Sequence, residues 1–320
     1  MVKRKARKTE KSSVNQYLFV HRMFTKAKVN MNDPVAVKKF IDGKRGRDKG
    51  PIKDTTRRNY YIALLALHGK SLNRGGTKFK LTPAARKTYL KLNEDLYEKR
   101  LQCDDRQELT PAMRKNWLTW KKFGDIVRRE VQKLSAMRTS GSDPGEIMFQ
   151  LQKIIVLKLY YVVPPLRLEY ADMVLTKTLP KNRKWNYITT VDKKMHLFKF
   201  KTVKSVKPQE WPLRKHPELF RYINRLIQLR NQKSTKIKQE NRLFLLLNPF
   251  TREKMTRTGL TIYLNGIFER NISSTMLRRI YLSEHFKVKR GESVADRKSV
   301  LSIMGQKHLS MQDRYRKIIR

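Results

Sequence analysis

Cysteine, acidic residues and long apolar stretches are scarce in this sequence of 320 residues, and each shortage argues against a class of protein. The single cysteine, Cys103, excludes a disulfide framework and a cysteine-based zinc site, and is typical of a reducing intracellular compartment. No stretch approaches the roughly 20 apolar residues of a spanning helix, and the segment MVKRKARKTEK lacks the apolar region of a secretion signal. His21, His196, His216 and His285 show no metal-ligand spacing with Asp, Glu or Cys. We therefore expect no membrane partner, no metal site and no cofactor.

The shortage of acidic residues leaves a very large positive charge. Lys and Arg number 74 against 27 Asp and Glu, which gives a formal net charge of +47. Such a chain would repel itself strongly, so a polyanionic partner is indicated, and double-stranded DNA is the preferred one. The basic residues run from Lys3 to Arg320, which predicts a positive folded surface rather than one basic tail. The run from Lys3 to Lys11 fits a nuclear-localisation patch and a disordered phosphate-contacting arm equally well.

The start of several helices is marked by a short polar residue followed by proline, a pair that supplies a cap and a residue preset for the first turn. Such pairs stand at Asp33-Pro34, Thr82-Pro83, Thr110-Pro111 and Asp143-Pro144. The third precedes Trp117 and Trp120, and the fourth has Glu146 in the capping-box position. A further helix is predicted from Asp54 to a stop at Gly69.

The chain is predicted to have two folded domains and to be mainly α with a small β-sheet. We expect a basic disordered arm over 1–14, a helical domain over 15–137, a small polar linker over 138–145 and a second domain over 146–320. In the second domain, 184–203 alternates in the manner of two strands with a turn near Asp192. Helices are expected after Pro217, over 259–268 and over 274–286.

Four residues, three basic and one aromatic, occur in an order along the chain that matters for function. Arg167 lies in PPLRLEYADM, Lys201 in FKFKTVKSVKPQEWPL, Arg278 in SSTMLRRIYLSEHF and Tyr315 in MGQKHLSMQDRYRK. This ordered set resembles the tyrosine recombinase, or phage-integrase, family, in its eukaryotic-virus or mobile-element branch. The resemblance covers nearly the whole chain. It implies a helical core-binding domain that contacts DNA and a mixed α/β catalytic domain.

The resemblance also implies roles for these residues. Arg167 and Arg278 would stabilise the charge that accumulates on the phosphate oxygens, since a guanidinium donates paired hydrogen bonds. Lys201 would protonate the leaving 5′ oxygen as general acid. Tyr315 would be the nucleophile and store the bond energy as a 3′-phosphotyrosine, so that neither ATP nor a metal is needed.

Two positions depart from the family pattern. Thr275 stands three residues before Arg278, where the family has histidine, and Gln306 stands nine before Tyr315, where histidine or tryptophan is usual. Both can donate a hydrogen bond to phosphate, but neither can shuttle a proton near neutral pH as imidazole can. His308 is a weaker candidate, because two residues along a helix turn a side chain by about 200°.

Other residues compete for some of these roles. Lys199 and Lys204 flank Lys201, and Arg279 adjoins Arg278. Arg167 could instead form a structural ion pair with Glu169. The rival tyrosines, Tyr263 and Tyr281, lie in helical apolar patterns and are predicted to be core residues, and His68 is expected to be structural. The residues expected to contact DNA are Arg57, Arg58, Lys121, Lys122 and Lys204.

The leading hypothesis is a site-specific recombinase or integrase that cuts and rejoins double-stranded DNA, and the resemblance implies a homotetramer on DNA. One alternative is a catalytically impaired relative that binds DNA in viral genome processing or transcription. Another is a type IB topoisomerase, which uses a similar set of residues to relax supercoils. An intracellular location is expected: the host nucleus for a eukaryotic virus, otherwise the cytoplasm or nucleoid.

Overall fold

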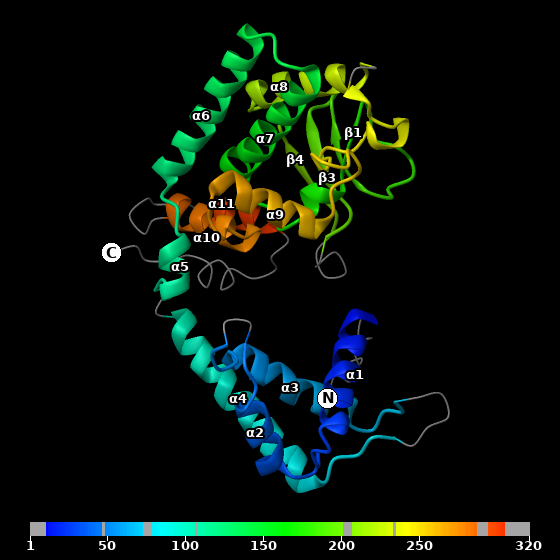
Figure 1. Ribbon diagram of the computed structural model, residues 1–320, viewed down its shortest axis with the longest axis vertical. Helices are drawn as coiled ribbons and strands as arrows, with labels where there is room; N and C mark the ends of the chain where they lie inside the picture. The colour runs from blue at the N-terminus through cyan, green and yellow to red at the C-terminus, as the bar shows by residue number, and fades with distance from the viewer. Residues whose placement is uncertain are drawn as a thin grey trace. The chain divides into compact units, whose positions relative to one another are not determined.

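The computed structural model describes residues 11–46, 49–72, 78–105, 108–200, 207–232, 235–286 and 294–304. Within these ranges the chain is mainly helical with one small four-stranded mixed sheet, as the sequence predicts (Figure 1). Of the helices in these ranges, none combines the length and the apolar character that crossing a bilayer requires.

The chain divides into two compact units, Met1–Arg106 and Gln107–Arg320. This division falls about thirty residues before the linker expected at 138–145, which instead forms the turn between two helices of the second unit. The reason is the packing of the segment before that turn. Trp117, Phe123, Val127 and Leu134 are buried in the same hydrophobic core as the helix that follows.

The amino-terminal unit contains α1 (Lys11–Lys26), α2 (Pro34–Asp42), α3 (Asp54–Leu67) and α4 (Pro83–Asp105). Its core is formed by Val20, Phe24, Ile41, Leu64 and Tyr89, among others. Because α1 begins at Lys11, residues 11–14 are helical rather than part of the expected arm. His68 accepts a hydrogen bond at Nδ1 from the amide of Leu81, a structural role as expected.

The carboxyl-terminal unit contains α5 (Pro111–Asn116), α6 (Trp120–Thr139), α7 (Pro144–Val162), α8 (Pro217–Arg230), α9 (Arg257–Phe268), α10 (Ser274–His285) and α11 (Val294–Ile303). Helix α7 is buried on nearly all sides and lies against α6 and α8. The Asp143 side chain caps it by accepting from the amides of Gly145 and Glu146. The sequence did not separate α5 from α6, where Thr119 accepts from the Lys122 amide and starts a new helix.

The sheet has the order β1 (Met173–Thr176), β2 (Asn186–Thr189), β3 (Lys194–Leu197), β4 (Gln209–Pro212). Strands β1 and β2 are parallel, whereas β2–β3 and β3–β4 are antiparallel. The turn predicted near Asp192 is confirmed between β2 and β3. The short 3₁₀ helix η1 (Glu169–Asp172) precedes β1, and another, η3 (Gln239–Asn241), follows α8.

Candidate functional site

Arg278 joins three segments of the carboxyl-terminal unit. It lies on the buried side of α10, a helix started by Ser273, whose Oγ accepts from the Met276 amide. Its side chain is 1% exposed. One guanidinium nitrogen, Nη1, donates to the Pro165 carbonyl at 3.3 Å, and Nη2 donates to the Met304 carbonyl at 2.9 Å. Helix α10 is thereby linked to the turn after α7 and to the residue that follows α11.

Arg167 lies on the same turn, two residues after the carbonyl that Arg278 binds. Its side chain is half-buried, and its guanidinium makes no hydrogen bond or ion pair with any residue that the structure describes. The alternative pairing with Glu169 is therefore not formed within these residues. Glu169 is itself buried, and its Oε2 has no hydrogen-bond partner there. The donors of Arg167 are available for an anionic ligand.

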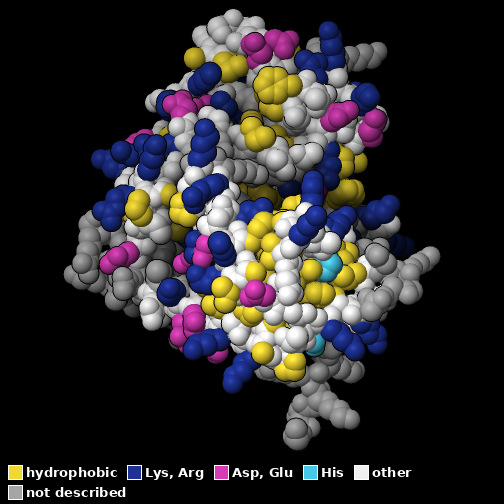
Figure 2. Space-filling view, turned by 60° about the horizontal axis from the view of Figure 1, so that its bottom comes forward, with side chains coloured by type: hydrophobic (Ala, Val, Ile, Leu, Met, Phe, Trp, Pro, Cys, Tyr) yellow, Lys and Arg dark blue, Asp and Glu magenta, His cyan; other side chains and the backbone are white. Residues whose placement is uncertain are grey.

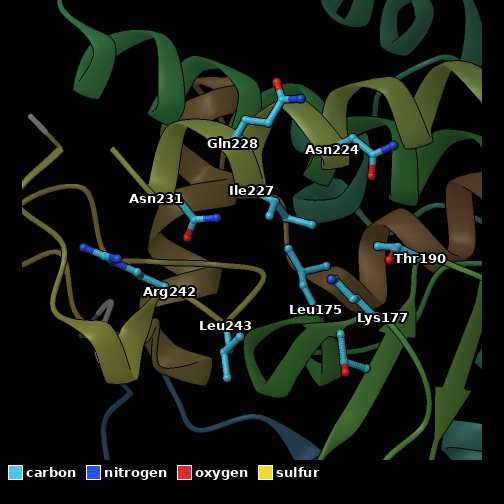
Figure 3. A pocket seen from close by; sticks show the side chains of 10 residues that line it. Leu175, Lys177, Thr190, Asn224, Ile227, Gln228, Asn231, Arg242 and Leu243 are labelled. Carbon is cyan, nitrogen blue, oxygen red and sulfur yellow. The ribbon is translucent and has the colours of Figure 1, made fainter. Parts of the chain in front are cut away.

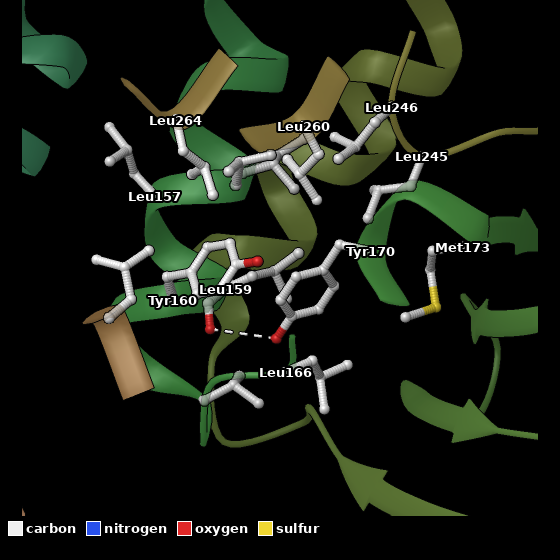
Figure 4. Close-up of a cluster of buried hydrophobic side chains, with 14 of the residues drawn as sticks. Leu157, Leu159, Tyr160, Leu166, Tyr170, Met173, Leu245, Leu246, Leu260 and Leu264 are labelled. Carbon is white, nitrogen blue, oxygen red and sulfur yellow. Dashed lines mark hydrogen bonds between the residues drawn. The ribbon is translucent and has the colours of Figure 1, made fainter. Parts of the chain in front are cut away.

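Two buried tyrosines, Tyr160 and Tyr170, lie near Leu166 of this turn (Figure 4), and one of them bonds to the turn. The Tyr160 hydroxyl, on α7, donates to the Arg167 carbonyl at 2.7 Å, and the Tyr170 hydroxyl donates to the Leu159 carbonyl at 3.4 Å. Burial raises the pKa of Tyr160 well above its ordinary value, Tyr170 and Glu169 add to this increase, and Arg278 opposes it. Burial likewise raises the pKa of Tyr170, so both tyrosines stay neutral hydrogen-bond donors. We call Arg278, the Pro165–Arg167 turn and Met304 the Arg278 corner.

Thr275 and the rival residues have distinct positions on the same helix. Thr275 lies in the first turn of α10, one turn before Arg278 and partly exposed, so the two side chains share one helix face. Arg279 points elsewhere, with Nη1 bonded to Met113 Sδ at 3.2 Å. Tyr281 is 6% exposed and stacks on His285, as expected of a core residue.

The remaining predicted catalytic residues lie outside the described ranges: Lys201, Lys204, Gln306, His308 and Tyr315. The backbone of Phe198 and Lys199, just before the segment that contains Lys201, is nevertheless held by hydrogen bonds. Asn186, which is fully buried, accepts from the Phe198 and Lys199 amides and donates to the Lys199 carbonyl. At the other end of this segment, Gln209 is hydrogen-bonded to Ser302 of α11.

The residues predicted to contact DNA differ in whether their side chains already have partners within the protein. Arg57 binds Asp42 at 3.1 Å, and Arg58 donates to Asn93 and lies 4.6 Å from the centre of the Tyr97 ring. Both guanidiniums are thus engaged inside the amino-terminal unit.

By contrast, Lys121 and Lys122 are exposed in the first turn of α6 and have no acidic partner among the described residues. Figure 2 shows Lys and Arg side chains spread over the visible face, with fewer Asp and Glu among them.

Sequence reasoning missed the supporting residues Tyr160, Tyr170 and Asn186. Their apolar or strand-like surroundings gave no signal, because their roles depend on contacts with residues distant from their own segments. Comparison with known protein families, curated proteins and solved structures found no match to this chain.

Proposed function

We propose that this protein is a DNA strand transferase of the tyrosine recombinase type. In this proposal Arg167 and Arg278 bind the scissile phosphate, Tyr315 attacks it, and Lys201 protonates the leaving 5′ oxygen. The attack forms a phosphotyrosine bond to the 3′ phosphate and breaks the bond to the 5′ oxygen, and a second DNA end later reverses the exchange. Two guanidiniums can stabilise the developing charge without a metal ion.

The observation that carries the proposal is the Arg278 corner. The Arg278 guanidinium contacts the turn that bears Arg167, whose own donors are unused by described residues, and it contacts Met304, eleven residues before Tyr315 in sequence. Residues far apart in the chain, from the first and third sequence boxes, therefore meet at one point.

Each part of the chain has a role in this proposed function. The amino-terminal unit, with α5 and α6 of the second unit, would serve as the helical core-binding part, and α7 to α11 with the sheet would form the catalytic part. Double-stranded DNA is the substrate, and four copies would act together on it. The nucleus of a eukaryotic host, or otherwise the nucleoid, is the corresponding location.

A covalent-trapping experiment tests this function. The full-length protein is incubated with a pool of nicked duplexes of randomised sequence, because the target sequence is unknown, and adducts that survive denaturation are isolated and sequenced. We expect adducts from the wild type and none from Tyr315→Phe. Tyr281→Phe, which keeps the buried ring, is the matched control and should still form adducts. Absence of any wild-type adduct would exclude both recombinase and topoisomerase activity.

Affinity for DNA separates the exposed lysines from the engaged arginines. The double variant Lys121→Gln, Lys122→Gln should lower the slope of log affinity against log salt by about one unit for each lost phosphate contact. Arg57→Gln should leave this slope nearly unchanged and instead lower the stability of the amino-terminal unit, because Arg57 is bound to Asp42. Equal slopes for the wild type and the lysine variant would remove α6 from the DNA interface.

A further inference from the structure

A pocket of about 450 Å³ opens where the parallel strands β1 and β2 end. Lys177 follows β1, Thr190 follows β2, and helix α8 forms the opposite wall (Figure 3). The carboxyl ends of parallel strands are a common place for ligands in sheets with helices packed on them, because the connecting loops diverge there. None of the lining residues belongs to the Arg278 corner.

Helix α8 and the residue that caps its carboxyl end, Asn231, contribute three side-chain amides to this pocket. Asn224, Gln228 and Asn231 are spaced by four and three residues and so share one exposed face of the helix. The side chains of Asn224 and Asn231 make no hydrogen bond with any described residue, and Gln228 only accepts one, from Arg225 at 3.3 Å. Each amide has both donor and acceptor capacity for a ligand.

The rest of the pocket combines an apolar surface with one positive charge. Leu175 and Ile227 form the base, and Leu243 stands at the rim with 58% of its surface exposed. Its backbone is fixed, since its carbonyl accepts from the Leu175 amide at 2.7 Å. In Figure 3 the Lys177 ammonium points toward Leu175 and Ile227, and Lys177 has no acidic partner among the described residues.

Arg242 contributes differently, although it also lines the pocket. Its guanidinium is turned away in Figure 3, and its Nε donates to the Ile237 carbonyl at 3.3 Å. Among the described residues that line the pocket, Lys177 is therefore the one cation directed inward, next to an apolar base and opposite a row of amides. An inorganic anion would use the cation alone and leave the other two features without a function.

We propose that this pocket binds a nucleotide. Its phosphate would bind Lys177, the edge of its base would hydrogen-bond to the α8 amides, and the face of its base would cover Leu175, Ile227 and Leu243. Asparagine and glutamine amides match the donor and acceptor pairs of base edges. The volume lies within the ordinary range of small-molecule pockets. The nucleotide is either free or an unpaired unit of a nucleic acid strand, and the proposal does not depend on Tyr315.

Calorimetric titration of the full-length protein tests this site, with AMP, GMP, CMP, UMP and inorganic phosphate as probes. We expect at least one monophosphate to bind about tenfold more tightly than phosphate, since the base adds hydrogen bonds and buried apolar area. Lys177→Gln should weaken binding of that nucleotide about tenfold, whereas Lys184→Gln, which removes the same charge from an exposed residue outside the pocket, should not.

The amides have their own matched test. The double variant Asn224→Ala, Asn231→Ala should abolish the preference for nucleotide over phosphate. Gln232→Ala, at an exposed residue that follows Asn231 but does not line the pocket, should preserve it. These residues are exposed, so the variants are expected to fold. Equal binding of all monophosphates and phosphate, or equal effects of Lys177→Gln and Lys184→Gln, would overturn the proposal in favour of general charge attraction.

The source of the nucleotide is found by competition. A short single strand should displace the bound monophosphate more strongly than the same strand made of abasic units if the site takes an unpaired nucleotide of a nucleic acid. Equal displacement by the two strands, with tight monophosphate binding retained, assigns the site to a free nucleotide. Normal adduct formation by Lys177→Gln on the nicked duplexes would show that the two sites act separately.

Discussion

Arg230 and Arg278 are two arginines of the carboxyl-terminal unit with nearly the same burial but different surroundings. Arg230 is 0% exposed and Arg278 1% exposed, and both donate to main-chain carbonyls. Arg230 binds the carbonyls of Phe244 and Leu245 and the side chain of Gln152, which itself bonds to both main-chain groups of Leu247. Arg230 therefore fastens α7 and α8 to the segment that covers the edge of β1.

Arg278 instead binds carbonyls that border the segments with predicted catalytic residues. Its partners are Pro165, in the turn that bears Arg167, and Met304, just before the segment that contains Gln306 and Tyr315. Burial lowers the pKa of Arg230 to about 9, so this guanidinium is still charged at neutral pH. A buried, charged arginine is thus not by itself a sign of catalysis. What distinguishes Arg278 from Arg230 is that the carbonyls it binds lie close in sequence to predicted catalytic residues.

The largest effect is expected from Arg230→Met. Methionine removes the Arg230 donors from the buried Phe244 and Leu245 carbonyls and leaves the Gln152 oxygen with the Leu247 amide alone, so the free energy of unfolding should fall by about 3 to 5 kcal/mol. Urea unfolding of the full-length protein measures this loss. Adduct formation by the fraction that remains folded should be normal, and a specific loss of adducts in a stably folded variant would break the distinction between the two arginines.

Arg278→Lys, in contrast to Arg230→Met, should affect adduct formation more than stability. Lysine keeps the charge but cannot reproduce the paired geometry of a guanidinium, so adduct formation should slow by about 10²- to 10³-fold while DNA affinity is retained. The free energy of unfolding should fall by only about 1 to 2 kcal/mol. Arg279→Lys, at the adjacent residue bonded to Met113, is the control. Equal slowing in both variants would show that any change on α10, and not the loss of the Arg278 guanidinium, slows adduct formation.

Tyr160→Phe tests whether the hydrogen bond from Tyr160 to the Arg167 carbonyl is needed to position the Arg278 corner. The change removes the donor to the Arg167 carbonyl, so we expect a loss of about 1 kcal/mol in stability and a several-fold slower adduct rate at saturating DNA. Tyr170→Phe removes a longer bond, to Leu159, that does not reach Arg167, and should change stability alone. If the two variants slow the reaction equally, Tyr160 has no positioning role beyond its part in the core.

Much of this fold follows from local signals in the sequence, whereas the corner does not. The proline-preceding caps place the starts of α2, α4, α5 and α7 correctly, because a cap depends only on residues within one turn. The start of α6 at Thr119 was missed, and so was the buried strand β1, whose four residues have no alternation.

The order of Arg167 and Arg278 could be found from sequence, but the contact through Pro165 could not. This contact joins residues 113 positions apart, and the segment that closes the corner, α11 with Met304, carries no clear periodic pattern. The division between the two compact units, after Arg106, could not be found from sequence for a related reason. The apolar stripe of α6 predicts that it packs, but nothing in that stripe says against which unit.

The smallest effect is expected where an arginine binds a carboxylate near solvent. Arg257 and Lys254 contact Asp172 at 2.8 and 2.6 Å, and the Arg257 side chain is 51% exposed. Burial raises the pKa of Asp172, but the hydrogen bonds from Lys254 and Arg257 outweigh it and hold this pKa below its ordinary value.

Because the pKa is lower in the folded protein, ionised Asp172 adds stability above its unfolded pKa of about 3.9, and this stability is lost as the pH falls through the folded value. Asp172→Asn should therefore cost about 1 kcal/mol at neutral pH and almost nothing in strong acid, as measured by urea unfolding across this range. A loss as large as that of Arg230→Met, or one independent of pH, would mean that burial is not what separates the strong arginine contacts of this fold from the weak ones.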